Sequence, residues 1–196
     1  FRPGGINRRG TIPPYAADFL TNYELGLKTT LADGRVRLNA AIYMQDWKRF
    51  QFSFLGENSF TEIHNGPNAR IKGIEADINI RPTEGLTISA AASYTDAKTR
   101  NKLCTFDDPT YVCATDDPAV PDKFVAAPKG TRLPVTPKFN GNATIRYQFP
   151  VGPGEMHLQS VIAHRGSATP DIRVATANAL GRIRGSTTVD FALAQV

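Results

Sequence analysis

The stretch Phe19–Trp47, FLTNYELGLKTTLADGRVRLNAAIYMQDW, decides the fold class. Its first part, 19–31, alternates apolar and polar side chains with a period of two, far beyond the roughly 5 or 6 residues of a usual soluble strand. Its last part, 35–47, alternates in the same way. The segment 32–34 between them reads Ala-Asp-Gly, and Asp and Gly tolerate the positive φ of a tight turn. The stretch therefore predicts a long antiparallel hairpin.

The same alternation recurs along the rest of the chain. We expect five further strands, of which the one around 156–165 has the weakest alternation. Their predicted ranges are 71–81, 86–97, 138–149, 156–165 and 187–196. With the first hairpin, the chain is predicted to contain about seven long strands.

The connections between these strands alternate strictly in length. Short turns at 32–34, 82–85 and 150–154 are interleaved with long connections at about 49–69, 98–136 and 167–185. A transmembrane β-barrel has short periplasmic turns at one rim and long extracellular loops at the other, whereas a soluble meander has no reason to sort its loops. The predicted fold class is all-β: an antiparallel, up-and-down wall of a transmembrane β-barrel.

Composition is compatible with this prediction and excludes several function classes. The chain is 41% hydrophobic and 21% charged, and its mean hydropathy of −0.29 suits strands that alternate between lipid and lumen. No apolar run approaches the roughly 18 residues that a membrane-spanning helix needs. The 23 basic residues are scattered among 18 acidic ones, which argues against a nucleic-acid partner. Nucleophile-elbow, HExxH, P-loop and Cys/His patterns are absent from the sequence, so we predict no enzyme, cofactor or metal site.

Strand parity predicts which side chains face lipid and which face the lumen. Tyr43 and Trp47 occupy positions of their strand whose side chains are otherwise polar. We therefore expect a β-bulge that turns these two side chains toward the apolar face. Lipid-facing positions are expected at Leu25, Leu27, Ile42, Ile78, Ala90 and Ile145. The expected lumen-facing residues include Glu24, Lys28, Glu75, Asp77 and Arg146.

Several short segments resemble the barrel of TonB-dependent receptors. They are NYELGLK (22–28), LNAAIY (38–43), ARIKGIEA (69–76), YTDA (94–97) and LPVTPK (133–138). They occur in the family's order and span about residues 15–149. The resemblance is therefore specific for the family, but it gives almost no information about the substrate.

The resemblance implies a barrel of 22 strands around a plug, and residues 1–196 are expected to be a C-terminal part of that barrel. The plug, the earlier strands and the final strands are then expected outside this sequence. The implied function is energised uptake of a scarce nutrient such as a ferric siderophore, cobalamin, haem or a saccharide, in the outer membrane of a Gram-negative bacterium. The implied partners are the plug of the full-length chain, the TonB complex, the extracellular nutrient and outer-membrane lipid. The alternative is a soluble or surface all-β ligand-binding module, whose apolar faces would pack against a second sheet.

Basic residues gather at the predicted extracellular rim. The topology brings five of them together: Arg70, Lys72, Lys98, Arg100 and Lys102. Anionic lipopolysaccharide phosphates are suitable partners for such side chains. Loop charges that serve solubility alone are the equal alternative.

The two cysteines, Cys104 and Cys113, lie in the same predicted extracellular loop. The chain reaches that position through the oxidising periplasm, where paired thiols are readily oxidised. We therefore predict a disulfide between them. A metal site is less favoured because two thiols without a nearby His do not complete a usual zinc set, and two free thiols are less favoured still.

Overall fold

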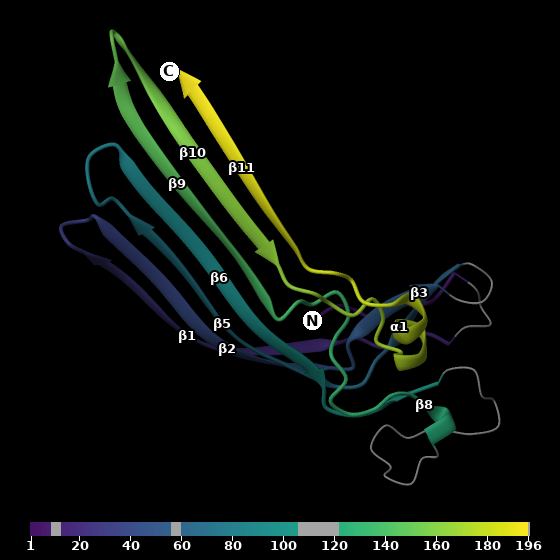
Figure 1. Cartoon of the computed structure of the whole chain (residues 1–196). Helices are drawn as coiled ribbons and strands as arrows, with labels where there is room; N and C mark the ends of the chain where they lie inside the picture. The colour runs from purple at the N-terminus through teal and green to yellow at the C-terminus, as the bar shows by residue number, and fades with distance from the viewer. Residues whose placement is uncertain (9–12, 56–59, 106–121, 196) are drawn as a thin grey trace.

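Seven long strands form one curved antiparallel sheet in a computed structural model that describes residues 1–8, 13–55, 60–105 and 122–195 (Figure 1). The strand order, β1-β2-β5-β6-β9-β10-β11, follows the order of the chain. The strands are β1 (Phe19–Leu31), β2 (Val36–Lys48), β5 (Ala69–Ile80), β6 (Leu86–Thr99), β9 (Phe139–Val151), β10 (Gly154–Arg165) and β11 (Ser186–Gln195). The predicted up-and-down wall of about seven long strands is confirmed.

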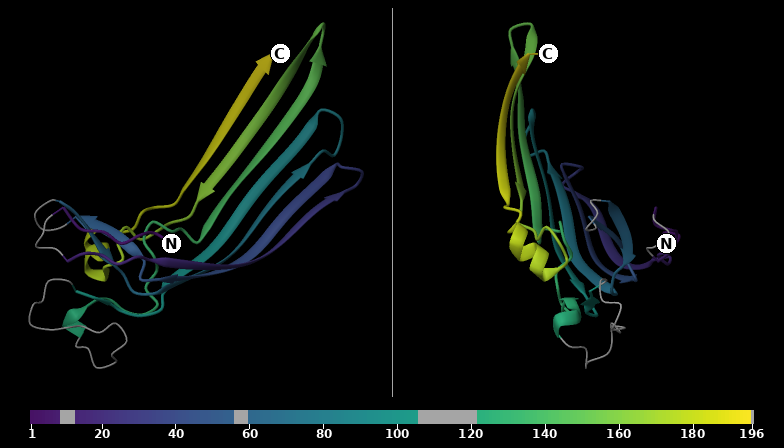
Figure 2. Two further views of the ribbon diagram at one scale, coloured as in Figure 1. Left: turned by 180° about the vertical axis from the view of Figure 1, so that it is seen from behind. Right: turned by 90° about the vertical axis from the view of Figure 1, so that its right-hand side faces the viewer.

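The two ends of the sheet differ, as the connection lengths predict. Tight turns join the strands at one end, called here the short-turn rim, and the long connections gather at the other, the long-loop rim (Figures 1 and 2). Within the first turn, Ala32, Asp33 and Gly34 all have positive φ, and the Arg35 N–H donates to the Ala32 carbonyl at 3.0 Å. Asp and Gly are suited to this conformation, so the turn forms where the sequence places it.

Short elements lie within the long connections. β3 (Gln51–Leu55) pairs with β4 (Thr61–Asn65), and β7 (Leu103–Cys104) pairs with β8 (Val125–Ala127) after the short 3-10 helix η1 (Asp122–Phe124). The helix α1 (Val174–Leu180) precedes β11. Among the described residues, no helix is long and apolar enough to cross a membrane.

One face of the sheet, here called the apolar face, exposes large hydrophobic side chains. Leu25 is 71% exposed, and it pairs across the sheet with Ile42, which pairs in turn with Ile74. Cross-strand partners share a face, so these residues form one continuous apolar surface. Its exposed members include Leu25, Leu27, Ile42, Ile74, Ile145, Leu158, Ile162 and Val189.

The buried hydrophobic core lies at the long-loop rim and not beneath the sheet. Phe50, Leu103, Leu133 and Ile172 are almost fully buried there, together with small alanines at the ends of β5 and β6. These residues come from the three long connections, β2 to β5, β6 to β9 and β10 to β11. The long connections therefore pack on one another, and residues 1–8 and 13–18 before β1 are hydrogen-bonded to them. We call this folded unit, including the segment before β1, the rim cap.

The expected β-bulge in β2 is wrong. β2 pairs with β1 and with β5 without any register shift, so Tyr43 remains on the polar face of the sheet. There its ring lies over Gly73, the partner of Tyr43 on β5, and its hydroxyl is 2.9 Å from Thr95 Oγ1 on β6. The missing side chain at Gly73 provides the space for the ring, which explains an aromatic residue at a polar parity.

Candidate functional site

The polar face of the sheet is built from two neighbouring rows of paired residues. In one row Gly26, Ala41, Glu75, Ser93 and Asn140 lie side by side across five strands. The next row toward the short-turn rim contains Lys28, Asn39, Asp77, Ala91 and Asn142. Small residues alternate with charged and amide side chains, so the face is polar and open.

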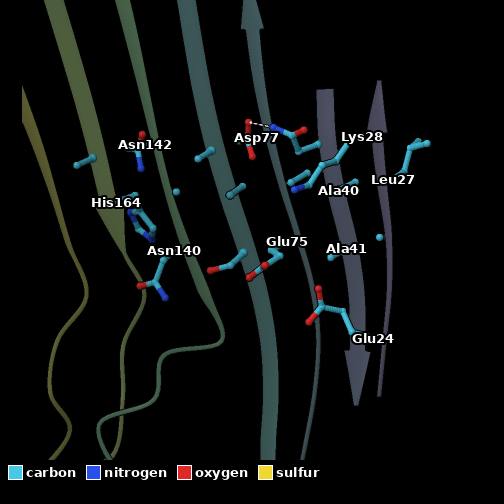
Figure 3. A pocket seen from close by; sticks show the side chains of 18 residues that line it. Glu24, Leu27, Lys28, Ala40, Ala41, Glu75, Asp77, Asn140, Asn142 and His164 are labelled. Atoms are coloured by element: carbon cyan, nitrogen blue, oxygen red, sulfur yellow. Dashed lines mark hydrogen bonds between the residues drawn. The ribbon is translucent and has the colours of Figure 1, made fainter. Parts of the chain in front are cut away.

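A hollow of about 720 Å³ lies against these two rows (Figure 3). Asn39 Nδ2 donates to Asp77 Oδ2 at 2.8 Å, and Glu24 and Glu75 project from β1 and β5 beside this pair. In the described part of the chain, no cluster of three metal-ligating side chains occurs.

The five predicted lumen-facing residues share this polar face. Glu24, Lys28, Glu75 and Asp77 line the hollow. Arg146 lies on the same face of β9, four residues beyond Asn142 toward the short-turn rim. The structure therefore brings four of the five together and leaves Arg146 apart.

The rim cap joins the segment before β1 to the β3–β4 hairpin through two asparagines. Asn7 Nδ2 donates to the Ile63 carbonyl at 3.0 Å and Asn7 Oδ1 accepts from the Ile63 N–H at 2.8 Å. Asn65 forms the same reciprocal pair with the backbone of Ala16, at 2.9 and 2.6 Å. Each asparagine side chain donates one hydrogen bond and accepts one from the same backbone residue, as a neighbouring β-strand would. These bonds connect the segment before β1 to the β3–β4 hairpin, although the two are not paired in a sheet.

Asp18 is the most heavily bonded side chain of the rim cap. Its carboxylate is 2% exposed and accepts from the Arg2 guanidinium, from Trp47 Nε1 at 3.1 Å and from the Gln51 N–H at 3.1 Å. Burial raises the pKa of Asp18, but hydrogen bonds from the Arg2 side chain and from the backbone N–H groups of Gln51 and Arg2 outweigh it and lower the pKa to about 2. Arg2 also lies over the Trp47 ring, 5.3 Å from its centroid.

The five basic residues of the predicted rim cluster do not line one pocket, although Arg70 and Lys98 are cross-strand partners. Arg70 forms a two-bond pair with Asp46, Nε to Oδ1 at 2.6 Å and Nη2 to Oδ2 at 2.8 Å. Lys98 pairs with Asp96 at 3.0 Å. Arg70 and Arg100 line one pocket, described below, to which Lys72, Lys98 and Lys102 do not belong.

The predicted disulfide lies outside the described residues, because Cys113 falls within 106–121. Cys104 is described and lies in β7, beside the buried Leu103. The pairing of the two cysteines stays a prediction.

Sequence reasoning missed the residues that organise the rim cap. Asn7, Asp18 and Asn65 contact segments far away in the chain, and no period or motif links such positions. The weak signal available was Asp18 itself, an acidic residue directly before a long alternating run.

A curved sheet with one apolar face, one polar face, short turns at one rim and packed loops at the other defines the wall of a transmembrane β-barrel. The family model described as "TonB dependent receptor-like, beta-barrel" matches residues 2–195. The chain belongs to this family of TonB-dependent receptor β-barrels.

Solved structures show the same fold at low sequence identity. The ferric yersiniabactin uptake receptor FyuA from Yersinia pestis is 19% identical with a TM-score of 0.69, and the match covers 97% of this chain and 25% of that one. BauA, the ferric preacinetobactin receptor from Acinetobacter baumannii, is 17% identical with a TM-score of 0.59, covering 94% of this chain and 23% of that one. The copper transporter OprC is 16% identical with a TM-score of 0.57, covering 92% and 23%. The chain spans about a quarter of the length of these proteins.

Proposed function

We propose that residues 1–196 are part of a longer outer-membrane receptor that takes up a scarce nutrient with energy delivered through TonB. The observation that carries the proposal is the contrast between the two faces of one sheet. The apolar face exposes Leu25, Ile42 and Ile74, while the opposite face carries Glu24, Glu75 and Asp77 around a hollow. Lipid on one side and a hydrated interior on the other account for both faces.

The soluble-module alternative agrees less well with this contrast. A soluble sandwich would cover the apolar face with a second sheet, but the described part of the chain provides only two small two-stranded sheets, and these lie in the connections at the long-loop rim. In the proposed orientation, the long-loop rim is extracellular and the short-turn rim periplasmic. The hollow on the polar face then faces the plug of the full-length receptor.

The rim cap is the proposed contact region for the nutrient. It is the part of the chain with a packed core and with cross-linking side chains, so it presents a defined surface to the medium. Ferric siderophores are the leading cargo class, since the similar structures include the ferric yersiniabactin uptake receptor FyuA, the ferric preacinetobactin receptor BauA and the siderophore receptor PiuA. Cobalamin, haem, saccharides and copper ions are the other classes to be compared.

The test is an uptake assay in cells that carry the full-length receptor. We expect one labelled cargo class to enter only when the receptor, TonB and the proton-motive force are all present. A variant with Asn7→Ala and Asn65→Ala should take up less of that cargo at limiting concentration, because the rim cap is loosened. Thr30→Ala, a change at an exposed side chain of the wall outside the hollow, is the matched control.

Two outcomes would contradict the proposal. One is uptake that proceeds equally well without TonB, and the other is recovery of the full-length protein in a soluble fraction rather than in the outer membrane. Heat-modifiable migration of the folded barrel in gels verifies that the variants compared are folded.

A further inference from the structure

Four basic side chains from separate segments converge on one pocket of about 410 Å³ at the long-loop rim. They are Lys48 at the end of β2, Arg70 at the start of β5, Arg100 just after β6, and Lys129 in the connection after β8. Asp46 is the acidic residue of the pocket lining. We call this group of five the cationic pocket; its formal charge is four positive against one negative.

The charges of the cationic pocket are not balanced from within. Asp46 is engaged by Nε and Nη2 of Arg70, which leaves the other terminal nitrogen of that guanidinium free of Asp46. Among the described residues, neither Lys48, Arg100 nor Lys129 forms an ion pair. Like charges gathered in one cavity repel one another unless an anion lies between them.

The backbone around the cationic pocket is tightly fastened. The Arg100 N–H donates to the Asn68 carbonyl at 2.6 Å, and the Arg49 N–H donates to Asn68 Oδ1 at 3.1 Å. Beside Lys129, the Gly130 N–H donates to the Thr99 carbonyl at 3.0 Å, and Thr99 Oγ1 donates to the Pro128 carbonyl at 3.3 Å. The four basic residues are thus positioned by the fold and not merely scattered on loops.

The position of the cationic pocket along the sheet indicates what kind of anion it meets. On the apolar face, Tyr94 and Phe139 are cross-strand partners, and Tyr23 pairs with Met44 one row further toward the long-loop rim. Aromatic residues typically mark the membrane interface. In the row directly beyond Tyr23 and Met44, Asp46 and Arg70 are partners on that same face. Charged residues directly beyond an aromatic row lie at the level of lipid head groups.

We propose that the cationic pocket binds the phosphate groups of an outer-leaflet lipid. The guanidinium groups of Arg70 and Arg100 match phosphate oxygens with paired donors, and Lys48 and Lys129 add point charges. The inference rests on the proposed outer-membrane placement, but it does not depend on which nutrient is carried.

The test compares two triple variants of the full-length receptor. The pocket variant is Lys48→Gln, Arg100→Gln and Lys129→Gln; it keeps Arg70, so Asp46 keeps its partner. The control variant is Lys72→Gln, Lys102→Gln and Lys138→Gln, which removes the same charge from the same rim outside the pocket and leaves the Lys98–Asp96 ion pair intact. Each purified receptor is placed in phosphatidylcholine nanodiscs with a bisphosphorylated glycolipid or its dephosphorylated form, and bound glycolipid is counted by native mass spectrometry.

We expect the pocket variant to bind the phosphorylated glycolipid about tenfold to a hundredfold more weakly than the unmodified receptor. The control should keep most of the binding, and the dephosphorylated glycolipid should bind all three proteins equally poorly. Equal loss in both triple variants would mean unspecific surface charge and would overturn the site, as would no loss in either.

Binding of inorganic phosphate to the same purified receptors is measured in a separate experiment. If inorganic phosphate alone occupied the pocket as well as the glycolipid did, a soluble anion would be the ligand and the lipid assignment would be wrong. Glycolipid binding is measured on purified, folded receptor, whereas uptake is measured in cells. Failure of uptake with intact glycolipid binding would contradict the proposed function alone.

Discussion

Gly73 and Tyr43 show how one residue on a strand determines what its neighbour across the sheet can be. A Cβ at Gly73 would overlap the ring of Tyr43, so the glycine is required by close approach and not by an unusual φ. The hydroxyl of Tyr43 reaches Thr95 on the next strand. One side chain therefore ties together three strands of the wall.

Gly73→Ala should destabilise the full-length barrel by about 1–3 kcal/mol, the usual range for an added group in a filled space. Thermal unfolding in detergent measures the effect. Gly26→Ala, in the neighbouring row, should change stability much less because its Cβ lies in open space near Ala40. Adding Tyr43→Ala to Gly73→Ala should recover part of the loss; simple additivity of the two changes would refute the overlap.

The carboxylate of Asp18 should make the rim cap sensitive to acid. Its pKa is lowered from 3.8 to about 2 in the folded chain, so the folded state binds fewer protons than the unfolded state. The stabilisation is therefore complete above pH 3.8 and is lost as the pH falls toward 2. Hydrogen exchange at the amides of 1–18 and 50–66 in the full-length receptor, corrected for the intrinsic pH dependence, should show this loss of protection.

Asp18→Asn is the matched comparison for that pH dependence. It keeps the size of the side chain but removes its charge, so protection in the rim cap should be lower at neutral pH and should change little between pH 3.8 and 2. A variant with the same acid response as the unmodified receptor would show that other carboxylates are responsible.

At the scale of the element, each long strand contributes to both faces of the sheet, because successive side chains point alternately to the apolar face and to the polar face. In β1, Leu25 and Leu27 lie on the apolar face, whereas Glu24 and Lys28 line the hollow on the other face. A substitution on β1 should thus have an effect that depends on its parity more than on its position.

Leu27→Arg should impair barrel assembly, because a basic side chain on the lipid face near mid-membrane costs about 2–4 kcal/mol. Thr30→Arg, on the polar face of the same strand, is the control and should be tolerated. The amount of heat-modifiable receptor in isolated outer membranes is the measurement. Equal amounts for the two variants would contradict the assignment of faces.

The long strands could be predicted from the sequence, whereas the short elements of the rim cap could not. A two-sided environment imposes a period of two on each of the seven long strands, so observed bounds such as 86–99 lie near the predicted 86–97. β3, β4, β7, β8 and α1 are too short to carry a readable period, and they form because the rim core of Phe50, Leu103 and Ile172 packs around them.

The same difference holds for the candidate site. Parity alone was enough to bring Glu24, Lys28, Glu75 and Asp77 to the hollow. The cationic pocket required knowledge of where β2 ends and how the connection after β8 returns to Thr99, so Lys48 and Lys129 were not among the predicted rim residues. The contact between Tyr43 and Gly73 could not be predicted from the sequence, because the space that Tyr43 fills on β2 is provided by a glycine on a different strand, β5.

At the scale of the whole molecule, strand order in space repeats strand order in the chain. Every large interface of the sheet is therefore formed between consecutive long strands. The three long intervals, β2 to β5, β6 to β9 and β10 to β11, contain small pairings of their own. Loop-closure entropy rises with the length of chain that must be closed, so no step of assembly has to close more than one such interval. The wall can therefore grow by successive addition of single strands to an existing edge.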